Sequence, residues 1–222
     1  MTSVRVIAID GAAGSGKSTL ARGLAGALGL PYLNTGTMYR ALTLVALDRG
    51  VDPDDAPGLA DLMSRLRFSL SAGQTPELEV EGSAPSPDLE SDRVEAHVSH
   101  VARHPEVRVL MREAQRRLGL PTAVVEGRDI GTVVFPDAPV KLFLTAAPQT
   151  RVERRTQERG GAGQIVGESL HRRDERDARV NPFEPADGAI ILDTGDRTVE
   201  ETLRIAIVLV RERIPDLPGV AQ

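Results

Sequence analysis

The feature that most constrains this chain is residues 11–18, which read Gly-Ala-Ala-Gly-Ser-Gly-Lys-Ser. They follow a largely apolar, β-branched run at 4–10, which predicts a buried strand. They precede residues 19–28, whose apolar positions recur at helical spacing and predict a helix. The pattern G-x-x-x-x-G-K-[ST] between a strand and a helix predicts a phosphate-binding loop. The alternative, a glycine-rich turn before an ordinary helix, is disfavoured because the whole pattern and both flanks agree.

This loop predicts how the chain holds a nucleoside triphosphate. The glycines let the loop curl so that successive backbone N–H groups converge on an anion, and the helix N-terminus adds roughly half a positive charge. We expect Lys17, one of only two lysines, to reach the β- and γ-phosphates, and the Ser18 hydroxyl to ligate Mg²⁺. The residues predicted to bind the ATP phosphates are Gly11, Ala12, Ala13, Gly14, Ser15, Gly16, Lys17, Ser18 and Thr19.

Composition narrows the class of protein further. With 222 residues, 41% of them hydrophobic and 27% charged, the chain has the balance of one soluble globular domain. The absence of cysteine excludes disulfides, thiolate metal sites and cysteine nucleophiles. A net charge of −5 and the lack of tryptophan argue against a nucleic-acid-binding surface. No apolar run approaches about 18 residues and no signal peptide precedes the first strand, so we expect a cytoplasmic protein without membrane partners.

Short apolar strands alternate with helices along most of the chain, which predicts an α/β fold. Strands are predicted at residues 4–10, 31–33, 122–125, 140–144 and 189–192. Helices are predicted at residues 19–28, 37–49, 58–65, 90–103, 105–119 and 199–213, with a turn at 34–36. Five such strands imply a parallel sheet covered on both faces, which is a three-layer sandwich. Ligands of these sheets bind at the carboxyl edge of the strands, where Arg40 and Arg128 are expected to lie.

Residues 66–70 and 78–81 break this alternation, because their apolar side chains recur with period two. They predict a small antiparallel hairpin with one buried face. We interpret the hairpin as an insertion into the α/β core, and in an enzyme an insertion at this point is expected to cover a second substrate.

Residues 151–179 hold eight arginines and are interrupted by a glycine-rich link. Arg151 and Arg155 lie four residues apart, on one face of a predicted helix. Further arginines fall in a second helical stretch, at Arg172, Arg173 and Arg176. One interpretation is a solvated, salt-bridged helical hairpin. The other is a mobile lid whose arginines grip phosphate and whose closure excludes water, and the phosphate-binding loop favours it.

Several longer motifs point to one family. They are residues 9–18, 35–40, 98–102, 105–108 and 115–117, and most specifically the block at 126–141 that begins Glu-Gly-Arg-Asp-Ile-Gly-Thr-Val-Val-Phe-Pro, followed by Arg-Asp-Glu-Arg-Asp at 173–177. Through them the sequence resembles the bacterial-type cytidylate kinases, which are nucleoside monophosphate kinases, over almost its whole length. The chain departs from that pattern at Glu126, where many members have aspartate, and in a shortened run after Asp177.

The resemblance implies transfer of the γ-phosphoryl group of ATP to CMP or dCMP, with Mg²⁺. It implies base recognition by Ser99, Arg108 and Asp129, since a carboxylate accepts from the cytosine amino group while arginine and serine donate to its carbonyl and ring nitrogen. The other residues that it implies for CMP binding are Thr35, Tyr39, Arg40, Arg128, Arg173, Asp177 and Arg179. The residues that it implies for catalysis are Lys17, Arg128, Arg151, Arg155 and Arg176.

The resemblance also implies a division of the chain into three parts. These are a P-loop kinase core at 1–61, 99–150 and 180–222, a CMP-binding insert at 62–98, and an arginine-rich lid at 151–179. A P-loop kinase of another nucleotide or small metabolite is the main alternative. A GTPase is disfavoured because no Asn-Lys-x-Asp motif occurs, and an ATP-dependent regulatory or nucleic-acid-binding module is disfavoured by the acidic charge and few aromatic residues. No large exposed apolar seam is evident, so we expect a monomer.

Overall fold

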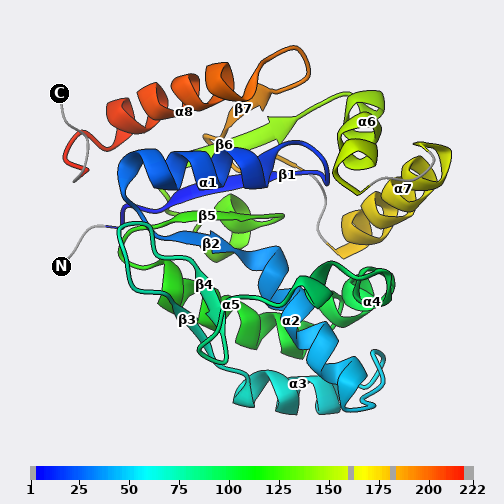
Figure 1. Cartoon of the computed structure of the whole chain (residues 1–222). Helices are drawn as coiled ribbons and strands as arrows, with labels where there is room; N and C mark the ends of the chain where they lie inside the picture. The colour runs from blue at the N-terminus through cyan, green and yellow to red at the C-terminus, as the bar shows by residue number, and fades with distance from the viewer. Residues whose placement is uncertain (1–3, 160–162, 181–183, 218–222) are drawn as a thin grey trace.

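A five-stranded parallel sheet with the strand order β2-β5-β1-β6-β7 forms the centre of the protein (Figure 1). The computed structural model describes residues 4–159, 163–180 and 184–217, without the side chains of 158–159, 163–166, 169, 173, 179 and 180. The strands are β1 (Ile7–Gly11), β2 (Tyr32–Asn34), β5 (Val124–Gly127), β6 (Val140–Thr145) and β7 (Ile190–Asp193). Asp10 of β1 is in register with Gly127 of β5 and Phe143 of β6, so these strands end at one common edge.

Helices α1 (Lys17–Leu28) and α8 (Val199–Arg213) cover one face of the sheet (Figure 1). Ile7 and Ile9 of β1 point to this face and are completely buried against the two helices. Helix α8 begins with a capping box, in which the Thr198 hydroxyl accepts from the Glu201 backbone N–H and the Glu201 carboxylate accepts from the Thr198 N–H.

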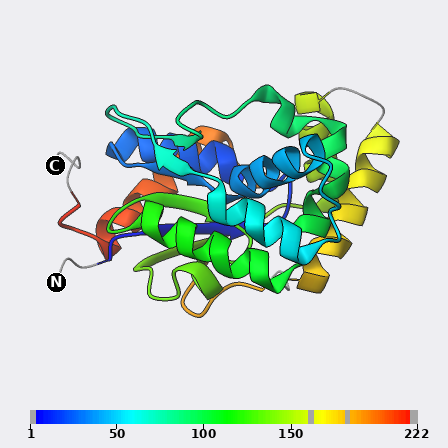
Figure 2. The ribbon, with the colours of Figure 1, turned by 90° about the horizontal axis from the view of Figure 1, so that it is seen from below.

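Helices α2 (Thr35–Asp48), α3 (Ala56–Arg65) and α5 (Pro105–Gly119) lie on the other side of the sheet, as the view in Figure 2 shows. Ala8 of β1 and Val125 of β5 point into this second core and are fully buried. Helix α5 packs tightly where it ends, since a Cβ at Gly119 would lie only 2.6 Å from the ring of Phe135. The two cores together make the three-layer arrangement that the alternation of strands and helices predicts.

The predicted antiparallel hairpin is confirmed as β3 (Phe68–Leu70) paired with β4 (Leu78–Val80). Phe68 and Leu78 bury their side chains in the second core. The loop of the hairpin lies beside β2, because the Tyr32 N–H donates to the carbonyl oxygen of Pro76 at 2.8 Å. A short 3₁₀ turn, η1 (Pro87–Glu90), and helix α4 (Asp92–Ala102) then lead back to the α/β core.

Helices α6 (Pro148–Arg159) and α7 (Gly163–Val180) lie beyond the carboxyl edge of the sheet, and both views place α7 beside α4 (Figures 1 and 2). A hydrogen bond of 3.1 Å from Ser99 Oγ of α4 to Asp177 Oδ1 of α7 joins these two helices. The two predicted arginine-rich helices are therefore confirmed.

Some boundaries differ from the sequence prediction. The turn predicted at 34–36 is wrong, because the Asn34 side chain accepts from the Thr37 N–H at 3.1 Å and caps a helix that already begins at Thr35. The helix predicted from residue 90 begins at Asp92, since 87–90 form the separate turn η1. A short π-helical turn, η2 (Ile130–Val134), follows β5 where no element was predicted. Within the part of the chain that the structure describes, no helix is both long and apolar enough to cross a membrane.

Candidate active site

The loop between β1 and α1 follows a path that two of its glycines make possible. Gly16 has φ 88° and directly precedes Lys17, the first residue of α1. Gly11 lies so close to β6 that an added Cβ would be 2.4 Å from the carbonyl oxygen of Leu144. Lys17 Nζ donates to the Ala12 carbonyl at 2.7 Å, which holds the ammonium group over the loop. The loop thus combines a helix N-terminus with a lysine at the sheet edge, an arrangement suited to phosphate.

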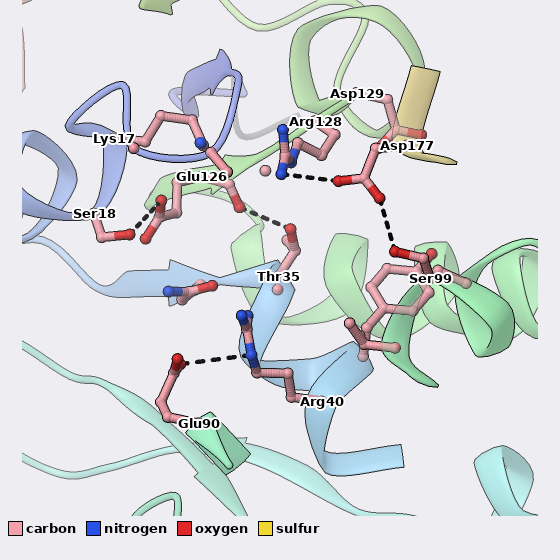
Figure 3. Close-up of a pocket in the computed structure, with 18 of the residues that line it drawn as sticks. Lys17, Ser18, Thr35, Arg40, Glu90, Ser99, Glu126, Arg128, Asp129 and Asp177 are labelled. Atoms are coloured by element: carbon pink, nitrogen blue, oxygen red, sulfur yellow. Dashed lines mark hydrogen bonds and ion pairs between the residues drawn. The ribbon is translucent and has the colours of Figure 1, made fainter. Parts of the chain in front are cut away.

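A pocket opens beside this loop, at the carboxyl ends of β1, β2 and β5 (Figure 3). The predicted site residues that line it are Ala13, Gly14, Lys17, Ser18, Thr35, Tyr39, Arg40, Ser99, Arg108, Arg128, Asp129, Arg155 and Asp177. The lining residues that were not predicted are Asn34, Gly36, Glu90, Val98, Ala102, Glu126 and Gly127. The fold therefore brings the phosphate-binding loop and most of the residues expected to bind an acceptor nucleotide to one pocket.

Glu126, at the carboxyl end of β5, is the most informative of the unpredicted lining residues. It is only 3% exposed, and its carboxylate accepts hydrogen bonds from Ser18 Oγ at 2.9 Å and from the Tyr32 hydroxyl. Burial, together with the Glu126 charge, raises the pKa of Tyr32, so this hydroxyl stays protonated and donates. A signal for Glu126 was present in the sequence, since it is an acidic residue at the end of a buried strand and opens the most specific motif.

The Ser18 hydroxyl and the Glu126 carboxylate fit a Mg²⁺ ion. Both are hard oxygen donors, and Mg²⁺ in phosphate-binding sites takes one or two such protein ligands together with phosphate oxygens. Ser18 Oγ and Glu126 Oε2 lie 2.9 Å apart, at the first turn of α1.

Asp129 and Arg108 form a largely buried ion pair on the opposite side of the pocket. Arg108 Nη2 lies 2.7 Å from Asp129 Oδ2, and Arg112 Nη2 lies 3.9 Å from the same oxygen. Tyr39 packs beside this group, and burial raises the pKa of Tyr39 to about 12. A carboxylate and a guanidinium fixed against each other offer an acceptor and donors in a set orientation, which suits the edge of a polar heterocycle.

Arg40 lies on α2 between the sheet and the predicted insert. Its guanidinium pairs with Glu95 at 2.8 Å. It also pairs with Glu90 at 3.6 Å (Figure 3). Arg155 of α6 reaches the other oxygen of Glu90 at 3.9 Å. Arg40 and Arg155 thus both approach the exposed carboxylate of Glu90. Two guanidinium groups placed in this way could also bind one phosphate group.

Arg128 joins the phosphate-binding loop to α7. Its Nη1 donates to the Gly11 carbonyl at 3.4 Å, and its Nη2 lies 2.8 Å from Asp177 Oδ2. Arg151 makes a parallel connection from α6, since it donates to the Ala13 carbonyl at 3.1 Å and pairs with Asp174 of α7 at 2.5 Å. The helices α6 and α7 are therefore tied to the loop by arginines.

Not every predicted site residue lines the pocket. Arg176 Nη1 donates to the Ala96 carbonyl of α4 at 3.4 Å, and neither of these residues lines the pocket. Gly11, Ala12 and Ser15 form the inner part of the loop, and Ser15 is completely buried. The side chains of Arg173 and Arg179 lie outside the described residues.

A second hollow lies on the other side of the loop, lined by Gly14, Gly16 and Thr19 together with residues of α6 and of the segment after β7. Arg154 forms one wall, and its guanidinium donates to Thr194 Oγ1 at 2.9 Å and to the Thr194 carbonyl at 2.5 Å. Arg154 and Thr194 were not predicted as site residues. No sequence signal marks them, because only the packing of α6 against the end of β7 brings them together.

The phosphate-binding loop at the end of β1, the parallel sheet and the arginine-rich helices over its carboxyl edge define the class of P-loop kinases. The sequence model of the cytidylate kinase family matches residues 7–212. The chain is 42% identical to the cytidylate kinase of Mycolicibacterium paratuberculosis, over 96% of this chain and 98% of that protein. It is 42% identical to the cytidylate kinase of Thermus thermophilus, over 93% and 98%. The chain belongs to the cytidylate kinase family.

One solved structure agrees with the fold at low sequence identity. An uncharacterized protein from Eubacterium ventriosum superposes with a TM-score of 0.53 at 14% identity, over 94% of this chain and 99% of that one. At this identity the likeness supports the fold alone.

Proposed function

We propose that this protein transfers the γ-phosphoryl group of ATP to CMP and dCMP, by direct in-line attack, and so forms CDP and dCDP. The observation that carries the proposal is that the phosphate-binding loop and the Arg108–Asp129 pair line one pocket. The loop accounts for the donor phosphates, and the pair accounts for a pyrimidine base that carries an amino group. Membership of the cytidylate kinase family supports the same acceptor.

The base specificity follows from hydrogen-bonding chemistry. Asp129 accepts from the cytosine amino group, whereas Arg108 and Ser99 donate to the carbonyl oxygen and ring nitrogen. Uracil carries a carbonyl where cytosine has its amine, so UMP would leave the Asp129 carboxylate facing another acceptor. A buried mismatch of this kind discriminates strongly, because neither group can turn to water.

The arginines supply the charge for the transfer. Arg40 and Arg128 are proposed to hold the acceptor phosphate, while Arg155, Arg151 and Lys17 neutralise charge on the transferring group. An acceptor that is itself a phosphate needs no strong general base, so positioning and neutralisation suffice. The catalytic role of Arg176 and the CMP-binding roles of Arg173, Arg179 and Asp177 stay predictions.

A bound Mg²⁺ would supply positive charge that neutralises phosphate oxygens of ATP. Ser18 and Glu126 are the residues proposed to hold it. Tyr32 donates to Glu126 and so keeps the carboxylate turned toward Ser18.

The insert and the lid are proposed to have the roles that were predicted from the sequence. Residues 62–98 form the acceptor side, and 151–179 form a lid that closes over both nucleotides and excludes water. The second hollow, which adjoins the loop at Gly14 and Gly16, is proposed to take the adenosine end of ATP. A monomeric state and a cytoplasmic location stay predictions from the sequence.

A panel of nucleoside monophosphates tests the proposal. ATP and Mg²⁺ are supplied with CMP, dCMP, UMP, AMP or GMP, and ADP formation is followed in a coupled assay. We expect CMP and dCMP to be turned over with much higher kcat/KM than the other three. A preference for another monophosphate would favour the alternative P-loop kinase, and the variant Lys17→Ala controls for contaminating kinases.

A further inference from the structure

Arg128 and Asp129, two of the residues proposed to bind CMP, lie in the turn that follows β5. Neither is part of a regular helix or strand. The loop that precedes α1 is the phosphate-binding loop, which is proposed to bind the phosphates of ATP. The two segments come from β5 and β1, which are neighbours in the sheet. The relative position of these two segments decides whether the phosphate groups of ATP and CMP meet. A direct contact between the segments would fix that position.

Asp10 makes that contact. It is the last residue before Gly11, and its side chain reaches across to the turn of β5. Asp10 Oδ1 accepts from the Ile130 N–H at 2.8 Å, and Oδ2 accepts from the Gly131 N–H at 2.7 Å. Asp10 is only 6% exposed, and it is not among the residues that line the pocket. Each oxygen of one buried carboxylate therefore holds one backbone amide of the residues that directly follow Asp129.

A second contact runs the other way between the same two segments. Arg128 Nη1 donates to the carbonyl oxygen of Gly11, the residue after Asp10. The turn is thus pinned to the donor loop on both sides of Asp129, by backbone amides at 130 and 131 and by a guanidinium at 128. A rigid frame of this kind is what holds a binding constellation within the tolerance that phosphoryl transfer needs.

The surroundings of Asp10 make its charge sensitive to pH. Burial raises the pKa of Asp10 to about 6, against the opposing effect of the two amide hydrogen bonds. The charged groups near it are Asp129 on the turn, which raises the pKa further, and Lys17 on α1, which lowers it. Arg128 lies on the same turn, Glu126 is on β5 and turned to Ser18, and the Lys141 ammonium of β6 is turned to the Asp187 carbonyl.

We propose that Asp10 is a positioning residue, which locks the acceptor-binding turn to the phosphate-binding loop and so sets the places of Arg128 and Asp129. The inference rests on the proposed function. Only an ionised carboxylate offers a strong acceptor to both amides. An asparagine keeps one acceptor and presents its amino group to the other N–H, whereas the hydroxyl oxygen of a protonated aspartic acid still accepts but more weakly. Either change loosens one end of the turn.

The variant Asp10→Asn tests this role by calorimetric titration with CMP and, separately, with a non-hydrolysable ATP analogue. We expect CMP affinity at pH 8 to fall about tenfold to a hundredfold, the range for small misplacements of binding groups. We expect affinity for the ATP analogue to change less than about threefold, and the preference for CMP over UMP to shrink. The matched control is Asp55→Asn, an aspartate that also accepts from a backbone N–H, at Gly58, but at the N-cap of helix α3.

A second measurement needs no variant. In the wild-type protein without nucleotides, the backbone amide resonances of Ile130 and Gly131 should titrate together with a midpoint near pH 6. If the folded Asp10→Asn variant binds CMP as the wild type does, or if the two amides show at no pH a titration that the Asp10→Asn variant lacks, the inference is overturned. Failure of the wild-type protein itself to bind CMP would instead contradict the proposed function, and the amide titration is independent of that outcome.

Discussion

Asp129 and Arg108 lie too deep for solvent to balance their charges, since their side chains are only 16% and 10% exposed. Each therefore depends on the other, and removing one partner of a buried pair commonly costs about 3–5 kcal/mol because an uncompensated charge is left behind. Asp129→Asn avoids most of this loss, because the amide oxygen can still accept from Arg108. It removes the charge that a cytosine amino group would meet.

We expect Asp129→Asn to lower kcat/KM for CMP about tenfold to a hundredfold, the equivalent of one charge-assisted hydrogen bond. The value for UMP should stay the same or rise, because an amide can donate to the uracil carbonyl. Steady-state kinetics with both nucleotides measures the ratio. Asp61→Asn, in the exposed pair with Arg65 at 2.7 Å, is the matched control and should change nothing. An unchanged CMP-to-UMP ratio in Asp129→Asn would show that Asp129 does not read the base.

Lys17 carries its charge on the first turn of α1, where its side chain contributes little to the core. Lys17→Ala should leave the melting temperature within a few degrees of the wild-type value and lower kcat about a hundredfold or more. Arg117→Ala, which removes an exposed cation of α5, serves as the control and should keep full activity. Near-normal turnover by the Lys17→Ala variant would remove the role assigned to the loop.

The two tyrosines of the sequence give a prediction about pH. Burial raises the pKa of Tyr39 to about 12, and burial together with the Glu126 charge raises that of Tyr32 further. The folded protein should therefore show little tyrosinate absorbance at pH 10–11, whereas the unfolded chain titrates near pH 10. Since the unfolded state loses these protons first, the free energy of unfolding should fall as the pH rises above 10. Tyrosinate absorbance of the native protein near pH 10 would contradict this account.

At the scale of elements, the strands and helices of the core were largely predictable from hydrophobic periodicity, and their ends were less so. The start of α2 depends on whether Asn34 turns its side chain back to a backbone N–H, and residue type alone does not settle this. The π-helical turn η2 has no periodic signal, because its amides are held by Asp10 from another strand. Elements that are stabilised by residues distant in the sequence cannot be predicted from the local sequence alone.

The helices α6 and α7 lead to a prediction about a moving element. Asp177 connects α7 to both Arg128 and Ser99, so α7 contacts the residues proposed to bind CMP. If 151–179 close over the nucleotides, limited digestion by an arginine-specific protease within this segment should slow about tenfold or more when CMP and an ATP analogue are both present. Digestion after Arg65, on the surface of α3, should be unaffected by nucleotides. Equal cleavage of 151–179 with and without nucleotides would indicate a static helical hairpin.

At the scale of the whole molecule, the α/β class and the meeting of distant residues at one sheet edge could be predicted, because parallel strands place their carboxyl ends together. Strand order could not, since nothing local states that β5 lies between β1 and β2. For the same reason the partners that support the pocket were missed. Tyr32 and Asp10 act through side chains that meet only after the sheet has formed. Sequence motifs identify the residues that would contact a ligand more readily than they identify the residues that hold these ligand-binding side chains in place.

Transfer of a phosphoryl group from ATP to CMP in this one pocket is the activity that we propose. The most direct measurement is a single turnover with ATP isotopically labelled in its γ-phosphate, Mg²⁺ and CMP, followed by separation of the nucleotides. We expect the label to appear in CDP at the rate at which it leaves ATP, and Lys17→Ala to abolish both. Label that appears as inorganic phosphate, or that stays in ATP while another monophosphate is phosphorylated in a parallel reaction, would contradict the proposed activity.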